Sequence, residues 1–283
     1  MFPVSLTITI APAINAFIDA LVTHYGDGFR SVGNVFLWLI VTVEQILRAM
    51  PWWLVTLIVA AIAFAASRRV VFAGLTTLAF FAVGVLGLWD QAMQTLALML
   101  VATSLSALIG IPLGAVLARS SRVSLIARPV LDAMQTLPSF VYLVPAMMLF
   151  GLGKVPALLA TVIYAMPPVA RLTELGLRTA DKDAVEAAVA FGASPRQKLW
   201  QVELPLALPS IMAGINQATM LALSMVVVAS MIGARGLGEE VLLGIQRLDV
   251  GRGVVAGLTI VILAVVLDRI SQAAAKSTPA GLR

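Results

Sequence analysis

The chain has 283 residues, of which 60% are hydrophobic and only 12% are charged. Soluble domains carry about 25% charged residues, so this composition excludes a soluble globular enzyme, a disordered tail and a disulfide scaffold. It predicts an all-α membrane protein with several spans, because most apolar side chains must face lipid or one another. The 19 Lys and Arg exceed the 14 Asp and Glu without forming a basic block, which favours membrane-flanking cations over nucleic-acid binding.

The N-terminal segment 1–50 differs from the rest of the chain. Over residues 32–50 the apolar positions recur at helical spacing, while Glu44 and Arg48 form an i,i+4 pair on another face. This pattern predicts an amphipathic helix lying in the membrane interface. An additional, tilted span over the same residues is the competing interpretation.

Seven apolar stretches approach the roughly 20 residues that a helix needs to cross the hydrocarbon core. They cover residues 52–66, 70–88, 92–118, 129–152, 155–170, 206–232 and 254–267. Prolines interrupt or end three of these stretches. The fourth stretch, 129–152, is interrupted at Pro138 and Pro145. The expected division is two N-terminal transmembrane helices in 51–88, a core in 89–272 and a tail in 273–283.

The basic residues predict an orientation for these stretches. If the polar loop 173–205 is cytoplasmic, the same side of the membrane receives the majority of the 19 Lys and Arg residues, as the positive-inside rule requires. Seven spans then place the N-terminus outside and the C-terminus in the cytoplasm, and an eighth would reverse the N-terminus only. Near the cytoplasmic boundary, Arg128 and Asp132 have the spacing of an i,i+4 pair.

The loop 173–205 is the longest polar segment and predicts two short helices. Asp183 can cap the first helix with Glu186 in a capping box, and Gly192 supplies the positive φ that ends it. The sequence Ser-Pro-Arg-Gln at 194–197 forms a second capping box with proline in the first turn. A helix pair specified in this detail predicts a docking element for a soluble partner. Its apolar side chains are Val185, Ala188, Val189, Phe191, Leu199 and Trp200.

The same loop has a spacing that is typical of one protein family. Glu186-Ala187-Ala188 is followed after three residues by Gly192, and after nine more by Val202, one residue and Leu204-Pro205. This arrangement resembles the EAA motif of ABC importer permeases, with Val202 in place of isoleucine. From about Trp89 to Gln272 the chain resembles the permeases that import quaternary ammonium compounds, the glycine betaine, proline betaine and choline family.

The resemblance implies a five-helix type I importer permease core, preceded by two transmembrane helices and an amphipathic segment, in a bacterial inner membrane. It implies a transport subunit for a quaternary ammonium compound such as choline or glycine betaine. The implied partners are a second permease copy in a homodimer, a pair of cytoplasmic ABC ATPases that dock the loop, and an extracytoplasmic substrate-binding protein. We expect the chain to have no enzyme activity, metal or cofactor of its own. ATP should bind to the partner ATPase, because Gly153-Lys154 of this chain lacks the rest of a P-loop.

Within the loop, six residues are expected to couple the permease to the ATPase. Glu186 either stabilises the first helical turn or pairs with a basic group of the ATPase, and the two roles are compatible. The alanines permit close helix approach, with simple helix propensity as the alternative. The glycine sets the angle between the two helices, and Leu-Pro fixes where the chain re-enters the membrane. The six are Glu186, Ala187, Ala188, Gly192, Leu204 and Pro205.

The solute pathway is predicted from the chemistry of a quaternary ammonium ion. Such an ion has no N–H donor, so proteins hold it against aromatic faces by cation–π attraction. The candidates are Phe140, Tyr142, Phe150 and Tyr164, with aromatic helix packing as the alternative. Ser224 and Met225 begin a run of small and flexible residues, where we expect the bundle interface and outer gate. A charged outer loop suits a binding protein, with Glu239, Glu240, Arg247, Asp249 and Arg252.

Three other function classes fit the sequence less well. The coupling loop also suits an ABC importer permease for another small polar solute. An ion-coupled secondary transporter would have ionisable residues near mid-membrane, and the seven stretches carry charge mainly at their ends. A scaffold gives no reason for the EAA spacing, and an intramembrane enzyme would need a catalytic constellation that one histidine and no cysteine do not supply.

Overall fold

The computed structural model describes residues 11–277, and every regular element within that range is helical. Five helices are long and apolar enough to cross a membrane, namely α1, α4, α7, the continuous run Pro195–Ser230 and α12. This confirms an all-α architecture with several candidate spans, and the total of seven stays a prediction. The elements are α1 (Ala11–Ala49), α2 (Trp52–Ser67), α3 (Val70–Val85), α4 (Trp89–Arg119), α5 (Ser121–Thr136), α6 (Ser139–Phe150), α7 (Lys154–Arg178), α8 (Lys182–Ala190), α9 (Pro195–Gln197), the π-helix η2 (Lys198–Glu203), α10 (Leu204–Ser230), α11 (Leu237–Gln246) and α12 (Val250–Ser277).

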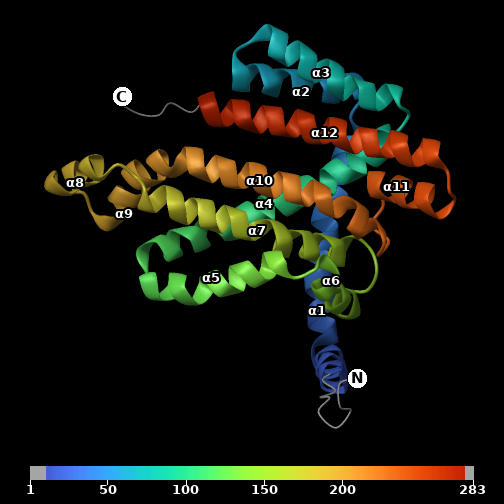
Figure 1. Cartoon of the computed structure of the whole chain (residues 1–283), viewed down its shortest axis with the longest axis horizontal. Coiled ribbons are helices and arrows are strands. Elements are labelled where there is room, and N and C mark those ends of the chain that lie inside the picture. The colour runs from blue at the N-terminus through green and yellow to red at the C-terminus, as the bar shows by residue number, and fades with distance from the viewer. Residues whose placement is uncertain (1–10, 278–283) are drawn as a thin grey trace, which may run out of the picture.

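Helices α4, α7 and α10 form the central bundle, with α7 packed against both of the others (Figure 1). Glycine on α4 allows its close approach to α7. A Cβ added at Gly114 would lie 2.5 Å from the carbonyl oxygen of Ala170, and one at Gly110 would lie 2.8 Å from Cβ of Val169. Small residues at such crossings let backbones meet, which is how helices associate when lipid removes the hydrophobic driving force.

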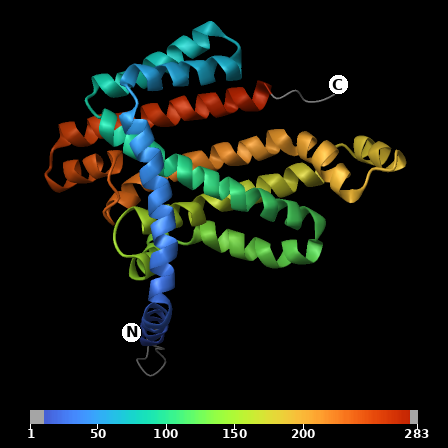
Figure 2. The same cartoon turned by 180° about the vertical axis from the view of Figure 1, so that it is seen from behind.

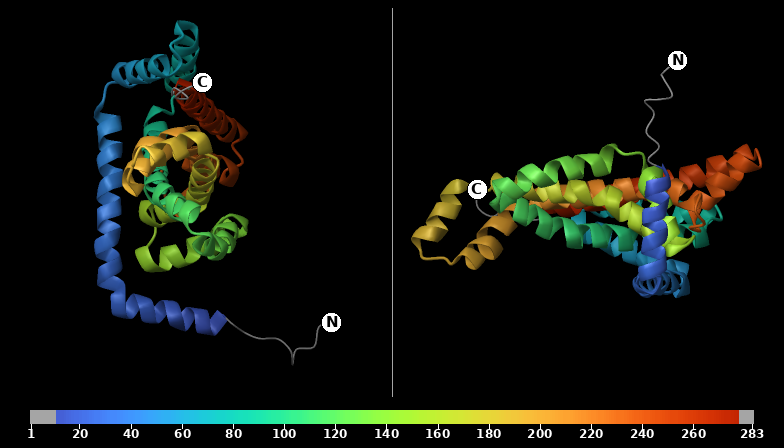
Figure 3. Two further views of the ribbon diagram at one scale, coloured as in Figure 1. Left: turned by 90° about the vertical axis from the view of Figure 1, so that its left-hand side faces the viewer. Right: turned by 90° about the horizontal axis from the view of Figure 1, so that it is seen from below.

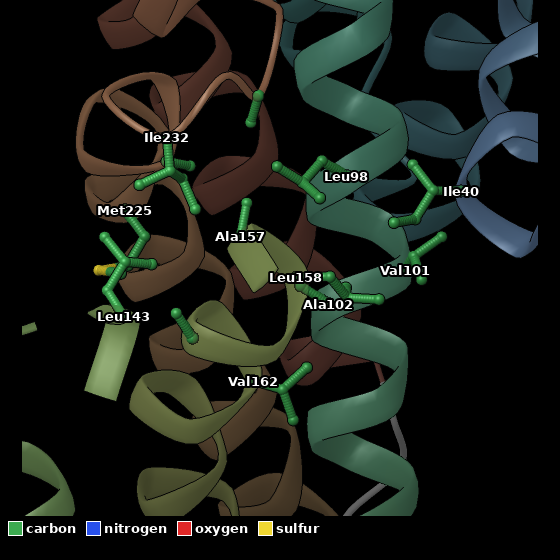
Figure 4. Close-up of a cluster of buried hydrophobic side chains, with 13 residues drawn as sticks. Ile40, Leu98, Val101, Ala102, Leu143, Ala157, Leu158, Val162, Met225 and Ile232 are labelled. Carbon is green, nitrogen blue, oxygen red and sulfur yellow. The ribbon is translucent and has the colours of Figure 1, made fainter. Parts of the chain in front are cut away.

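A cluster of buried apolar side chains fills the part of this bundle next to α1. Figure 4 shows Leu98 and Ala102 of α4 on the side of Leu158 of α7, while Val101 projects from the far side of α4 toward Ile40 of α1. Met225 of α10, Ile232 in the turn after α10 and Leu143 of α6 close the cluster from the other side. The cluster therefore joins the three core helices to α1 and α6.

Helix α12 and the α2–α3 hairpin form a second layer beside the bundle (Figure 1). Phe80 of α3, Leu263 of α12 and Met93 of α4 share one buried cluster. Helices α2 and α3 have 16 residues each, so both are apolar but shorter than the five candidate spans.

The predicted stretch 129–152 is not one helix, which corrects that prediction. It contains the end of α5 and all of α6, and the two helices meet at 92°. Leu137 is extended, with φ −66° and ψ 134°, because the residue before a proline is excluded from the helical region. Pro138 is then the N-cap of α6, so the chain changes direction at this point. Prolines marked the break in the sequence, whereas the angle depends on packing.

Helix α1 runs unbroken over Ala11–Ala49 and crosses the direction of the bundle helices, as Figures 1 and 2 show from the two sides. Viewed along the bundle in Figure 3, α1 lies across it, and its N-terminal part turns aside. The predicted Glu44–Arg48 pair is present at 3.6 Å. Glu44 also pairs with Lys154 at the start of α7, and Arg48 with Asp90 at the start of α4. These contacts attach α1 to one end of the bundle.

Turns with basic residues gather at the opposite end of the bundle. The α2–α3 turn, the α4–α5 turn, the loop with α8 and α9, and the C-terminal part of α12 all lie there (Figure 1). Arg178 donates to the carbonyl oxygen of Leu117 at 2.9 Å, and Arg119 pairs with Glu203 at 3.7 Å. Arg269 of α12 shares a cavity with Arg68 and Arg69. The structure thus brings together the turns that the charge pattern assigns to one side.

Candidate coupling site

Helix α8 begins two residues earlier than the capping prediction placed it. The side chain of Asp181 is the N-cap and accepts a hydrogen bond from the Asp183 backbone N–H at 2.9 Å. The prediction that Asp183 caps the helix in a box with Glu186 was therefore wrong. Asp181 and Asp183 are both suitable N-cap residues by type, and Asp181 is the one that caps α8. Glu186 lies one turn into the helix, exposed to solvent.

The end of α8 is confirmed at Gly192, which has φ +82°. Its N–H donates to the carbonyl of Val189 at 2.9 Å, and the N–H of Ala193 donates to the carbonyl of Ala188 at 3.0 Å. These two bonds form a Schellman motif, which needs the left-handed conformation at this position. A Cβ at Gly192 would meet nothing within 4 Å, so the requirement is one of backbone conformation alone.

The second helix starts with the predicted capping box. The Gln197 N–H donates to Ser194 Oγ at 3.3 Å, and the Ser194 N–H donates to Gln197 Oε1 at 2.8 Å. The π-helix η2 that follows was not predicted. Pro205 accounts for it, because its ring needs room at the carbonyl four residues earlier, which a wider turn supplies. Leu204 is half-buried and Pro205 exposed at the start of α10.

The hairpin built by α8, α9 and η2 projects beyond the bundle (Figure 3, right) and exposes both apolar and acidic groups. Phe191 is 92% exposed and Trp200 is 69% exposed, an arrangement that a solvated loop would not favour. Glu186 and Ala187 are also exposed, and Ala188 is half-buried. The surface is suited to contact with another protein.

Glu203 forms two ion pairs at the base of this hairpin, and one of them joins the hairpin to the bundle. Glu203 pairs with Lys198 of η2 at 3.2 Å and with Arg119 at the end of α4 at 3.7 Å. Beside it a cavity of about 190 Å³ lies between the hairpin and the end of α7. Glu186 lines this cavity together with Arg178 and Glu203. The base of the hairpin is therefore held to the end of α4 by a direct ion pair.

A buried carboxylate on α7, which sequence reasoning did not single out, organises the same end of the bundle. The Glu174 side chain is 5% exposed and accepts from Ser124 Oγ at 2.8 Å. The guanidinium groups of Arg128 and Arg178 each lie 3.0 Å from the same carboxylate oxygen. Because Arg178 also bonds to Leu117, this cluster joins α4, α5 and α7.

The predicted Arg128–Asp132 pair is not formed. Asp132 forms an ion pair with Arg171 of α7, and Arg128 forms an ion pair with Glu174 of α7. The spacing along α5 was correct for a local pair, but α7 packs against α5 and offers partners from a second helix. Local spacing could not identify these partners, which are 39 and 46 residues away in the chain.

The residues predicted for the solute pathway are only partly brought together. Tyr142 and Tyr164 both pack against the buried cluster that contains Met225. Phe150 instead stacks edge-on against Phe29 of α1, with ring centroids 5.6 Å apart. Phe140 and Ser224 are exposed, and the Ser224 hydroxyl donates to the carbonyl of Met220 in its own helix at 3.0 Å.

Residues 110–278, more than half of the chain, match the family described as "Binding-protein-dependent transport system inner membrane component". The chain belongs to this family. It is a permease subunit of an ABC importer, and hence a transport protein and not an enzyme.

Two curated relatives and one solved structure show how far the likeness extends. The permease is 51% identical over 262 residues to the glycine betaine/proline betaine transport system permease protein ProW of Escherichia coli, covering 92% of this chain and 73% of the relative. It is 44% identical to the glycine betaine/carnitine transport permease protein GbuB of Listeria monocytogenes, covering 94% and 95%. A MetNI methionine ABC transporter structure matches with a TM-score of 0.59 at 22% identity, covering 65% and 92%, and supports the fold alone.

The end of the bundle opposite the coupling hairpin contains a second polar group, which the sequence indicated only as a charged loop. Arg252 donates to Glu240 at 2.6 Å, and Gln91 of α4 donates to the same carboxyl group at 3.4 Å. The Leu237 N–H at the start of α11 donates to Thr95 Oγ1 at 2.9 Å. These contacts hold α11 between α4 and α12, while Arg247 and Asp249 are exposed beside it.

Proposed function

We propose that this permease imports a quaternary ammonium compound, glycine betaine or a related solute such as choline, using ATP hydrolysed by a partner ATPase. The high identity to ProW over nearly the whole chain is the observation that carries the proposal. The solutes named for ProW and GbuB share a quaternary ammonium group and a carboxylate, so betaine-type solutes are favoured over choline, which lacks the carboxylate.

A permanently charged solute needs a path that replaces its hydration. Tyr142 and Tyr164 lie on the same buried cluster and are the aromatic faces best placed to act together along such a path. Met225 contributes a polarizable side chain there. We assign Phe140, Phe150 and Ser224 secondary roles, because Phe150 packs against α1 while Phe140 and Ser224 are exposed on faces that a second subunit could cover.

The coupling function is assigned to α8 and its boundaries. Glu186, Ala187 and Ala188 form the part of α8 that docks in the ATPase, with Phe191 and Trp200 as apolar anchors. Gly192 sets the hairpin angle, and Leu204-Pro205 connects it to α10. Closing of the ATPase pair would move this hairpin, and the Glu203 and Glu174 contacts would carry the motion into α4, α5 and α7.

The assembly that follows is two permease copies, two ATPases and an extracytoplasmic binding protein. We place the coupling loop and the C-terminus in the cytoplasm, since the end of the bundle that carries them also carries most of the arginines. The charged outer end around α11 then faces the binding protein. Seven spans and an interfacial α1 are retained, because α1 lies across the direction of the spanning helices.

Reconstitution tests the proposal. Proteoliposomes containing the permease and its cognate ATPase, supplied with the binding protein, should accumulate radiolabelled glycine betaine when ATP is hydrolysed. A non-hydrolysable ATP analogue should abolish accumulation, and an imposed proton or sodium gradient should not replace ATP. Accumulation driven by an ion gradient would contradict the mechanism, whereas ATP-driven accumulation of only an unrelated polar solute would contradict the solute assignment.

A further inference from the structure

A large cavity opens between the α2–α3 turn and the C-terminal part of α12, at the same end of the bundle as the coupling loop. Its volume is about 730 Å³. Three guanidinium groups from two separate parts of the chain, Arg68, Arg69 and Arg269, contribute to its wall. Cations that only determine topology have no need to converge on one space, so their convergence suggests a ligand. The remaining lining residues are Ala65, Ala66, Ser67, Phe72, Gln272 and Ala273.

These three arginines have no carboxylate partner within the described part of the chain. The nearest acid along α12 is Asp268, which accepts hydrogen bonds from Asn216 and Gln272 instead. The cavity therefore has a concentrated positive charge and planar donors suited to phosphate oxygens.

The backbone of the turn holds two of these arginines in place. Arg68 has φ +54°, a conformation uncommon for a residue with a side chain, and its N–H donates to the carbonyl of Phe64 at 2.7 Å. The Ser67 hydroxyl accepts from the Arg69 N–H at 3.2 Å and donates to the carbonyl of Ala63 at 2.8 Å. The backbone of the turn is thus locally fixed, and both arginines start from the wall of the cavity.

The α2–α3 hairpin is short relative to the thickness of a bilayer. Helices α2 and α3 have 16 residues each, which corresponds to about 24 Å against a hydrocarbon core of about 30 Å. A hairpin this short draws headgroups inward or extends long cationic side chains to them. Arg269 lies two turns before the end of α12 and reaches the same level from the neighbouring helix.

The same hairpin also has an apolar groove between α2 and α3, with a volume of about 600 Å³. Leu57, Phe64, Leu78 and Phe81 are exposed side chains of this groove. Phe64 directly precedes Ala65 of the basic cavity in α2. One hairpin therefore offers a cationic cavity for a headgroup and an apolar surface for hydrocarbon chains.

We propose that this cavity and groove bind one anionic phospholipid, with its phosphate between Arg68, Arg69 and Arg269 and an acyl chain along the α2–α3 groove. Basic pockets between transmembrane helices on the cytoplasmic side are typical sites for acidic headgroups. The bound lipid would join the peripheral hairpin to α12. This site is separate from the solute pathway and does not depend on which solute is carried.

Lipid titration of the detergent-solubilised permease tests the site, with bound lipid counted by native mass spectrometry. The triple variant Arg68→Gln, Arg69→Gln and Arg269→Gln should bind phosphatidylglycerol on the order of 100-fold more weakly than the wild type, because each cation contributes about fivefold. All three side chains are exposed, so the variant should keep the wild-type melting temperature in detergent without added lipid.

A charge-matched control separates this site from general attraction to a basic protein. Arg122→Gln, Arg235→Gln and Arg247→Gln remove three exposed arginines elsewhere and should leave the affinity for phosphatidylglycerol unchanged. Equal binding of phosphatidylcholine by the wild type, or equal loss in both triple variants, would overturn the proposal. Competition by inorganic phosphate as strong as that by phosphatidylglycerol would also overturn it, since the site would then bind a soluble anion.

Discussion

Removal of the Glu174 carboxylate should loosen the joint between α5 and α7 and uncouple the permease from its ATPase. The structure shows one nearly buried acid with three partners: Ser124 and Arg128 donate hydrogen bonds to it, and Arg178 forms an ion pair with it. Two of these partners come from α5 and one from α7. No other described acidic side chain has three side-chain partners on two helices.

The size of the effect follows from how exposed each partner is. In Glu174→Ala the buried Ser124 hydroxyl loses its acceptor, which costs about 1–3 kcal/mol. The Arg128 and Arg178 side chains are 57% and 36% exposed and can turn to water, so each lost pair costs at most about 1 kcal/mol. The free energy of unfolding of the variant should therefore be lower by about 1–5 kcal/mol. Glu174→Gln keeps an acceptor for Ser124 and should lose less.

Thermal unfolding in detergent and ATP-driven uptake in proteoliposomes measure the two consequences. The matched control is Glu186→Ala, which removes an exposed carboxylate from α8. It should change the free energy of unfolding by no more than about 0.5 kcal/mol, as is usual at the surface, yet reduce uptake because the docking surface is altered. Glu174→Ala should lower both stability and uptake.

A double-mutant cycle gives the decisive comparison. Glu174→Ala and Ser124→Ala should show a coupling energy of about 0.5–3 kcal/mol, since the two side chains share a buried hydrogen bond. Additive effects, or a Glu174→Ala protein as stable as the wild type, would refute the reasoning. Loss of stability with full uptake would show that the cluster is structural and carries no motion.

Three further substitutions test other parts of the molecule. Gly192→Val should abolish uptake without affecting membrane insertion, whereas Gly192→Asn, which tolerates a positive φ, should retain part of it, as measured by uptake and membrane fractionation. Gly114→Ala places a Cβ 2.5 Å from a backbone carbonyl of α7 and should lower the free energy of unfolding by about 1–3 kcal/mol, while Gly74→Ala, with open space around it, should not lower it. Tyr142→Ala with Tyr164→Ala should raise the KM for uptake about 3- to 30-fold through lost cation–π contacts, and the Tyr→Phe pair should not; wild-type uptake by the alanine pair would remove both residues from the pathway.

The coupling hairpin could be predicted because its determinants are local. The Ser194–Gln197 capping box and the break at Gly192 depend on residues within four positions of each other, and both are present. The first cap was misplaced, since Asp181 and Asp183 are equally suitable by type and only the register of the helix start decides between them. The coupling role of the EAA residues themselves stays a prediction.

Long-range pairing could not be predicted in the same way. Glu174 lies one turn before Arg178, so the sequence spacing alone could have predicted this ion pair. Its contacts with Ser124 and Arg128 depend on how α5 folds back against α7. The fold-back starts at Ser120, between α4 and α5, and the chain bends again by 92° beyond Thr136. A proline indicates where a helix stops, whereas the packing of α5 on α7 determines the direction that the chain then takes.

The distribution of close contacts indicates which helices move together. Gly110 and Gly114 lock α4 against α7 backbone to backbone, and Glu174 ties α5 to the same pair. The Glu203–Arg119 contact adds the coupling hairpin, so α4, α5, α7 and α8 are linked by polar or backbone contacts at one end. Between α10 and α12, by contrast, the polar side-chain contact among the described residues is the single Asn216–Asp268 bond. Helices joined by both close packing and polar contacts transmit displacement as a unit. Motion imposed on α8 should therefore carry α4, α5 and α7 together. The displacement should be accommodated where α12 and the α2–α3 hairpin meet the bundle.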